Sequence, residues 1–339
     1  MPVHVVAKYV IVLFKKGWTS VHRLMFDFLN VTETAALASF AWVGSGNKME
    51  ADRAATESMR TLLNQIPMSG TVVIGEGEID EAPMLYIGER VGNGSGPEID
   101  LAVDPIDGTT PTINGQNDAI AVIAATPKGA LLNAPDMYME KIATGPRAKG
   151  IIDINQSLED NLYAVAEASG KQVNELTVII QGRERHQGMI DSIRSLGGKV
   201  LLFEEGDVIP AISTCVEHLN IDMFIGIGGA PEGVLAAVGI KSLGGDMQAR
   251  LLPRTKEEYE RCKKMGLSDP EQALILNDLV NADDCLFIAT GITNNMLIRG
   301  IRQDKNKFIT HSLLINGRDK KMRYTETEHF FTRKAALTV

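Results

Sequence analysis

The sequence predicts an α/β fold in which short strands alternate with helices. Apolar runs typical of strands end at residues 74, 103, 180, 203 and 227, and a loop rich in glycine or charge follows each of them. The chain has 339 residues and is 44% hydrophobic, which is enough to bury a sizeable core in one large domain or in two. Because ligands in open α/β sheets bind outside the carboxyl ends of strands, these loops predict one shared cleft.

Residues 1–24 are expected to form an N-terminal extension ahead of the fold. The apolar run from Val5 to Phe14 is interrupted by Lys8, and the basic pair Lys15 and Lys16 follows it. A membrane span is longer than this run, and a secretory signal carries its basic residues first, so the segment fits neither.

The rest of the chain is expected to divide into two subdomains. A metal-binding α+β subdomain is predicted over residues 25–155, and a substrate-binding α/β subdomain over residues 156–339. Besides the strands that end at the positions above, the pattern predicts a strand over Ile120–Ala124, a connecting loop over Gly145–Asp153 and a helix over Leu158–Ser169.

The first candidate metal ligands are two acidic residues near predicted element ends. Asp52 precedes Ala55 by three residues on a predicted helix, which places it on the inward side. An inward carboxylate needs a partner, and Lys48, one turn earlier, offers a plain salt bridge as the alternative to a metal. The β-branched run Thr71–Ile74 leads to Glu76, which has a glycine on either side and therefore room to project from a strand end.

The most specific motif is Asp-Pro-Ile-Asp-Gly-Thr-Thr at residues 104–110. Carboxylates such as Asp104 and Asp107 are ligands that Mg²⁺ and Mn²⁺ prefer, usually together with the phosphate of the substrate. Pro105 fixes one backbone torsion, and Gly108 lets the backbone approach a ligand closely. If a helix starts at Thr109, its first amides also face phosphate oxygens. The alternative is an ordinary helix-capping turn.

A further acidic residue lies at a later junction. The apolar strand Met223–Ile227 leads into Gly-Gly-Ala-Pro-Glu-Gly, which places Glu232 ahead of a predicted helix over Val234–Leu243. Glu232 is therefore either a metal ligand or a favourable charge in a first helical turn, worth a few tenths to about 1 kcal/mol.

Two other loops are candidates for binding a phosphorylated sugar. After the predicted strand Thr177–Ile180, Arg183 and Arg185 occupy alternate positions from which guanidinium groups can fork onto phosphate oxygens. After the strand Lys199–Phe203, the turn Glu204–Asp207 can accept hydrogen bonds from sugar hydroxyls. For both loops the alternative is an exposed, solvated segment.

Composition and missing motifs exclude several other classes. A net charge of −9 disfavours nucleic-acid binding, and six histidines without His-Glu-x-x-His spacing disfavour zinc. The sequence has no Gly-x-Ser-x-Gly elbow and no Gly-Lys-Ser/Thr phosphate loop. A dinucleotide fingerprint beginning at Gly226 fails at Pro231. Three cysteines without a pairing pattern indicate reduced thiols and a cytoplasmic protein.

Five segments together resemble class II fructose-1,6-bisphosphatase, within the inositol-monophosphatase-like, lithium-sensitive phosphatase superfamily. The similarity begins near Asn30 and continues almost to the C-terminus. The segments are VTETAALA (31–38), GTVVIGEGEIDEAPMLYIGE (70–89), LNAPDMYMEK (132–141), GGAPEG (228–233) and ATGIT (289–293).

The resemblance implies a layered αβαβα sandwich and a homo-oligomer. It implies two-metal hydrolysis, with Mn²⁺ or Mg²⁺, of the 1-phosphate of fructose 1,6-bisphosphate, a reaction of gluconeogenesis. Sedoheptulose 1,7-bisphosphate is a second implied substrate, and the alternative is an inositol-monophosphatase-like enzyme acting on another small phosphate monoester.

The resemblance also assigns roles to individual residues. Asp52 and Glu76 are expected to hold one metal ion, and Asp104, Asp107 and Glu232 the other, while Glu76 and Thr109 orient or deprotonate the attacking water. The residues implied to bind the substrate are Asp107, Gly108, Thr109, Tyr138, Arg183, Glu184, Arg185, Glu205, Gly206, Asp207 and Gly229.

Overall fold

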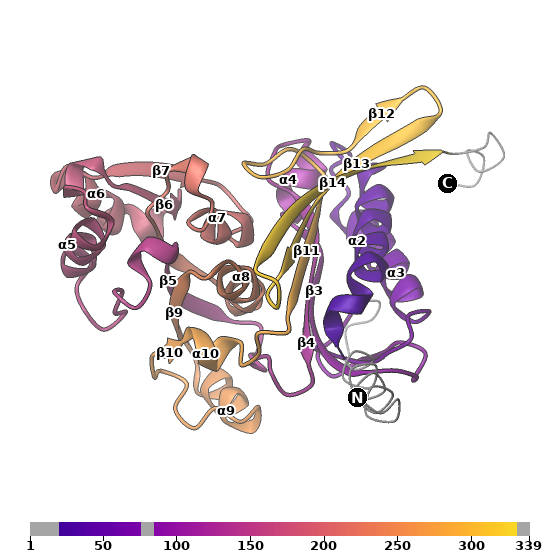
Figure 1. Cartoon of the computed structure of the whole chain (residues 1–339), viewed down its shortest axis with the longest axis horizontal. Helices are drawn as coiled ribbons and strands as arrows, with labels where there is room; N and C mark the ends of the chain where they lie inside the picture. Colours follow the sequence, from indigo (N-terminus) through magenta and orange to yellow (C-terminus); the bar gives the residue numbers. More distant parts are fainter. Residues whose placement is uncertain (1–19, 76–84, 331–339) are drawn as a thin grey trace, which may run out of the picture.

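The computed structural model describes residues 20–75 and 85–330, and it is an αβαβα sandwich of two mixed sheets with helices between and outside them. Figure 1 shows α5 and α6 on one outer side, α7 and α8 between the sheets, and α2 and α3 on the other outer side. The fold class and the layered arrangement expected from the sequence are confirmed.

The first sheet has eight strands, in the order β12-β13-β11-β4-β3-β1-β2, with β14 paired to β13. Strands β1 and β3 are parallel, whereas β4, β11, β13 and β14 continue the sheet in antiparallel pairs. The bounds are β1 Ser69–Ile74, β2 Arg90–Val91, β3 Glu98–Asp107, β4 Ile120–Pro127, β11 Leu286–Gly291, β12 Arg302–Asp304, β13 Lys307–Asn316 and β14 Lys321–Phe330.

The second sheet has six strands, in the order β10-β9-β5-β8-β6-β7. Here β6 pairs in parallel with both β7 and β8, so the carboxyl ends of these three strands lie at one edge. The bounds are β5 Tyr138–Thr144, β6 Thr177–Gln181, β7 Lys199–Phe203, β8 Met223–Gly229, β9 Asp246–Leu251 and β10 Leu274–Ile275.

The helices fill the three remaining layers and the connections. The α-helices are α2 Met25–Phe40, α3 Lys48–Leu63, α4 Thr109–Asn114, α5 Leu158–Ser169, α6 Gln187–Ser195, α7 Val208–Ser213, α8 Ala230–Leu243, α9 Lys256–Lys264 and α10 Leu276–Leu279. Short 3₁₀ turns are η1 Val21–Leu24, η2 Pro146–Ala148, η3 Val173–Glu175, η4 Glu184–His186 and η5 Glu217–Leu219.

Alternating side chains of the strands explain the layers. On β3, Leu101 packs in the core beneath α2 and α3, whereas its neighbour Ala102 packs in the core shared with α8. On β6, Ile179 faces the middle layer, while Val178 and Ile180 face α5 and α6. Because both faces of each sheet are covered, these strands appear in the sequence as continuous apolar runs. Helix α8 is buried along most of its length for the same reason.

The chain passes from one sheet to the other at positions other than residue 155. The first sheet takes its strands from residues 69–127 and 286–330, and the second from residues 138–275. The two-subdomain division therefore stays a prediction, and the C-terminal strands return to the sheet that holds the N-terminal ones. The end of the predicted extension also packs against the fold, because Val21 and Leu24 are buried in the core under α2.

The Asp-Pro-Ile-Asp motif lies inside the last residues of β3 rather than in a loop after it. The pairing of β3 with β4 shifts register between Asp104 and Asp107, which is the irregularity expected where proline interrupts a ladder. Helix α4 begins at Thr109, which was the condition for its first amides to face phosphate, and Gly108 precedes it with φ +95°.

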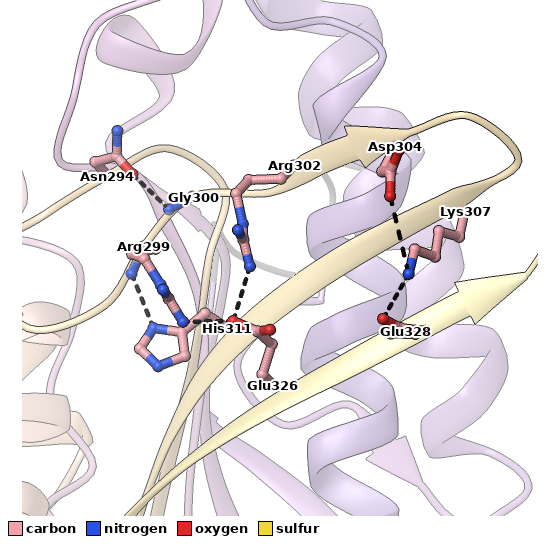
Figure 2. A network of polar contacts seen from close by, with 9 residues as sticks. All are labelled: Asn294, Arg299, Gly300, Arg302, Asp304, Lys307, His311, Glu326 and Glu328. Atoms are coloured by element: carbon pink, nitrogen blue, oxygen red, sulfur yellow. Dashed lines mark hydrogen bonds and ion pairs between the residues drawn. The ribbon is translucent and has the colours of Figure 1, made fainter.

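A polar network secures the strands β12, β13 and β14 and the loop that leads to them (Figure 2). Arg299 and Arg302 both pair with Glu326, and the backbone amide of Arg299 donates to His311 Nδ1 at 3.0 Å. In the same loop, the carbonyl of Asn294 accepts the amide of Asp118 at 2.7 Å. The network thus supports the segment that follows α4. Within residues 20–75 and 85–330, no helix has the length and apolar character needed to cross a bilayer.

Candidate active site

Four of the predicted strand-end loops meet at one cleft of about 700 Å³, and Gly75 brings the end of β1 to it as well. The prediction of a shared cleft is therefore confirmed. Its described lining residues are Lys48, Asp52, Gly75, Val103, Asp104, Ile106, Asp107, Gly108, Thr109, Thr110, Asp136, Tyr138, Gln181, Arg183, Arg185, Glu205, Gly206, Asp207, Gly228, Gly229, Pro231 and Glu232.

Two of the predicted site residues do not appear in this lining. Glu184 belongs to η4, where it is exposed. Glu76 lies outside the described residues, so its expected role as a ligand and as a catalytic group stays a prediction. The other predicted site residues come together in the lining of the cleft.

Asp104, Asp107 and Glu232 form a compact carboxylate cluster, in which one oxygen from each lies within 4.8 Å of the others. The first two come from the end of β3, and Glu232 comes from the first turn of α8 in the middle layer. Residues 125 positions apart in the chain thus face one another because α8 packs between the two sheets.

Burial and mutual repulsion disfavour the charged forms of these acids. Burial, then the charges of Glu232 and Asp207, raise the pKa of Asp107 well above its usual value. Burial and the charge of Asp207 likewise raise the pKa of Glu232 to about 7. The positive charge of Lys141 opposes both shifts. A divalent cation among these carboxylates would favour the charged forms and reverse the shifts.

Unpartnered buried oxygens show that the donor set fits a cation. Asp52 Oδ1, Glu232 Oε2 and Asp207 Oδ1 are buried and have no hydrogen-bond partner among the described residues. A buried carboxylate oxygen without a donor is costly unless a cation or a ligand satisfies it. Carboxylate oxygens are also the donors that Mg²⁺ and Mn²⁺ prefer, so the residues fit the expected metal ions.

Asp52 stands apart from the carboxylate cluster but lines the same cleft. It lies in the second turn of α3, on the inward side that the helical spacing predicted. Burial raises its pKa, whereas the charge of Lys48 and a hydrogen bond from Thr109 oppose the rise. Lys48, the alternative salt-bridge partner in the sequence, therefore acts on Asp52 through its charge.

Close packing leaves space only for glycine at two turns of the site. At Gly108, which has φ +95°, a Cβ would lie 3.0 Å from the carbonyl oxygen of Asp118. At Gly229 a Cβ would lie 1.9 Å from Glu232 Oε2. The backbone can therefore lie against the carboxylates and against the ligand, which is the use of glycine that the motif indicated.

Guanidinium groups of Arg183 and Arg185 also line the cleft. Arg185 and Arg254 both lie over the ring of Tyr138, with Cζ 5.3 Å and 3.8 Å from its centroid. Arg183 forms an ion pair with Glu205, with 3.1 Å between Nη2 and Oε1. Arg185 is exposed, as the alternative of a solvated loop expected, but its Nε also donates to the carbonyl of Ile227 at 3.0 Å.

His186 joins the ends of β6 and β8 just beneath these arginines. The amide of Ile227 donates to Nε2 at 2.8 Å, so the proton of the neutral ring resides on Nδ1, which donates to the carbonyl of Gln181 at 2.9 Å. The side chain is fully buried, and burial lowers the pKa of His186 below its usual value. Protonation would remove the acceptor for Ile227 and separate the two strand ends.

We expect His186 to make the folded protein less stable in mild acid. The pKa of His186 in the folded protein lies below the unfolded value of about 6.5. The stability that the neutral ring contributes is therefore present above about pH 6.5 and is lost as the pH falls through the folded pKa. Denaturant unfolding of the wild type and His186→Gln between pH 7.5 and 5.5 measures this, since all other titrating groups are common to both. A constant difference in unfolding free energy across this range would contradict the assignment.

Sequence reasoning missed two buried residues of the site. One is His186, and the other is Lys141, which is 1% exposed and bonded to Asp207 and Gly229. A signal for Lys141 existed, because it alternates with Met139 and Ala143, which are buried on the same face of β5. A lysine at such a position needs an anionic partner.

The layered α/β fold and a cleft lined by a carboxylate cluster and by guanidinium groups are those of a metal-dependent phosphatase. A family model described as bacterial fructose-1,6-bisphosphatase, glpX-encoded, matches residues 22–329, and the chain belongs to this family. The resemblance read from the sequence is thereby confirmed.

Curated relatives match nearly the whole chain. Fructose-1,6-bisphosphatase 1 class 2 of Escherichia coli (strain K12) is 48% identical in an alignment of 325 residues, and the match covers 92% of this chain and 96% of the relative. Fructose-1,6-bisphosphatase class 2 of Haemophilus influenzae is 47% identical over 320 residues, 91% and 96% of the two chains. A solved structure, extragenic suppressor protein suhB from Bartonella henselae, is more distant, at 16% identity and a TM-score of 0.33 over 56% of this chain and 72% of that one, and the assignment does not depend on it.

Proposed function

We propose that this protein hydrolyses the 1-phosphate of fructose 1,6-bisphosphate to give fructose 6-phosphate and phosphate, a step of gluconeogenesis. The observation that carries the proposal is the cleft itself, which combines a carboxylate cluster with guanidinium groups around Tyr138. A substrate with two phosphates would use both the carboxylate-held cations and the guanidinium groups. Relatives named for this activity at 48% identity support the same substrate.

The scissile phosphate is assigned to the side formed by β3 and α4. Asp104, Asp107 and Glu232 would hold one Mn²⁺ or Mg²⁺ ion, and Asp52, with Glu76, the other. When bound, such ions supply Lewis-acid polarisation of the phosphate and a lowered pKa for water. Thr109, at the start of α4, has its hydroxyl beside Asp52, from which it can orient the attacking water.

The sugar and the remote phosphate are assigned to the second sheet. Arg185 is fixed by hydrogen bonds to the carbonyl of Ile227 and to Gln181 Oε1 and is stacked on Tyr138, so its remaining donors are held in place for a phosphate. Asp207 has one unpartnered buried oxygen that can accept a hydrogen bond from a sugar hydroxyl. Glu205 and Gly206, which follow β7, and Gly229, at the end of β8, complete this wall.

Some finer assignments belong to the same proposal. Mn²⁺ or Mg²⁺ as the cofactor, a homo-oligomer and a cytoplasmic location are inferred from the family resemblance and from the chemistry of the donor set. All three cysteines are free thiols, which agrees with a reducing compartment.

The test is phosphate release from a panel of phosphate esters with Mg²⁺ or Mn²⁺, each with and without Li⁺. The panel contains fructose 1,6-bisphosphate, sedoheptulose 1,7-bisphosphate, fructose 6-phosphate, glucose 1-phosphate and inositol 1-phosphate. We expect the highest kcat/KM for fructose 1,6-bisphosphate and inhibition by Li⁺. Equal or faster hydrolysis of inositol 1-phosphate would favour the alternative, an inositol-monophosphatase-like enzyme.

A further inference from the structure

A buried lysine lies directly behind the substrate wall of the cleft. The side chain of Lys141, on β5, is 1% exposed, and its Nζ is 2.5 Å from Asp207 Oδ2 and 2.7 Å from the carbonyl oxygen of Gly229. One ammonium group therefore joins β5, the loop after β7 and the turn between β8 and α8. Each of these segments contributes to the cleft.

The surrounding backbone is shaped around this contact. At Gly228 a Cβ would lie 2.3 Å from Asp207 Oδ2 and 3.0 Å from Lys141 Nζ. At Gly233 a Cβ would lie 3.1 Å from the Lys141 side chain. The glycines thus leave space for the aspartate and the lysine, which makes the pair a built part of the site.

The two carboxylate oxygens of Asp207 have different surroundings. Oδ2 is held by the ammonium group, whereas Oδ1 is buried and has no partner among the described residues. The charge of Lys141 balances that of Asp207, so the pair as a whole attracts a cation weakly, yet Oδ1 still accepts a hydrogen bond. In the part of the chain that the structure describes, Asp107 and Glu232 are affected by the lysine only through its charge.

We propose that Lys141 is a positioning residue: it holds Asp207 so that Oδ1 accepts a hydrogen bond from a sugar hydroxyl, and its charge keeps Asp207 from acting as a further metal ligand. This inference rests on the proposed function for the identity of the sugar. The effect of Lys141 on metal binding is independent of the proposed function, because Mn²⁺ binding is measured without substrate. Without the ammonium group, Asp207 becomes one more uncompensated carboxylate beside Asp107 and Glu232.

The test is calorimetric titration with Mn²⁺ alone, together with steady-state kinetics on fructose 1,6-bisphosphate. We expect Lys141→Met to bind Mn²⁺ about tenfold more tightly, since a unit charge is removed close to the ions. We expect its KM to rise about tenfold with a smaller change in kcat, since Asp207 is no longer aimed at the hydroxyl. Asp207→Asn leaves the ammonium group unbalanced, and it is expected to weaken Mn²⁺ binding by a similar factor.

The double variant Lys141→Met, Asp207→Asn separates this role from a purely structural one. Both charges are gone, so Mn²⁺ affinity is expected to return to the wild-type value, whereas loss of support for Gly229 would persist. Lys171→Met is the matched control, because Lys171 forms the same kind of contact, 2.5 Å from Asp222, between connecting segments outside the cleft lining. It should leave Mn²⁺ affinity unchanged.

Two results would overturn the proposal. One is a Lys141→Met protein with unchanged or weaker Mn²⁺ affinity. The other is an Asp207→Asn protein that binds Mn²⁺ like the wild type, and this result decides the question even if Lys141→Met does not fold. A wild type that binds Mn²⁺ but does not hydrolyse fructose 1,6-bisphosphate would instead refute the proposed function.

Discussion

Asp104→Asn is expected to abolish phosphate release while leaving the fold intact. Its carboxylate belongs to the cluster with Asp107 and Glu232, and removing one negative ligand weakens the hold on a divalent cation. The cation is expected to supply several kcal/mol of transition-state stabilisation, so kcat should fall by roughly three orders of magnitude or more. Phosphate release at saturating fructose 1,6-bisphosphate measures the loss.

Asparagine can keep a backbone hydrogen bond that Asp104 makes at the end of β3, and the fold should therefore survive the substitution. Oδ1 accepts the amide of Ile106 at 2.9 Å, and an asparagine carbonyl oxygen accepts the same hydrogen bond. The thermal midpoint of metal-free Asp104→Asn should therefore stay close to that of the wild type. Asp191→Asn, an exposed position on α6, is the control and should keep full activity. An Asp104→Asn protein with wild-type turnover would remove this residue from the metal site.

Site residues that lie within one loop could be predicted, because such loops begin where an apolar strand ends. Runs such as Thr177–Ile180 and Met223–Ile227 are apolar since both faces of their sheet are covered, and a ligand-binding loop then begins where the apolar run stops. The residues of one such loop share a short stretch of chain, so their chemistry is visible in the sequence. Asp104, Asp107 and Gly108 were identified in this way.

The remainder depends on contacts between distant residues, which a single sequence does not show. The role of Lys141 depends on its contact with Asp207, 66 positions later, and that of His186 on its hydrogen bond with Ile227, 41 positions later. The return of β11, β13 and β14 to the first sheet is likewise set by antiparallel pairing across the core. The boundary at residue 155 followed the order of the chain, whereas the sheets follow these pairings.

Divalent cations are expected to stabilise this protein more strongly at pH 8 than at pH 5. In the metal-free protein, burial and like charges raise the pKa of Glu232 to about 7, from an unfolded value near 4.5. The stability that comes from its protonated form is present below the unfolded pKa and is lost as the pH rises through the folded one. Asp107, whose pKa is also raised, adds to the loss in the same direction.

Metal binding opposes this loss, because the cation binds the deprotonated carboxylates that are otherwise repelling one another. At a free Mn²⁺ concentration a hundred times Kd, the expected gain is about 2.7 kcal/mol. At pH 5 protons compete for the same oxygens, so the shift of the thermal midpoint on adding Mn²⁺ should be much smaller. Glu232→Gln removes one titrating ligand, and it should both raise the metal-free midpoint at pH 8 and reduce the response to Mn²⁺. Equal Mn²⁺ shifts at the two pH values, or an undiminished shift in Glu232→Gln, would show that the ions bind away from this cluster.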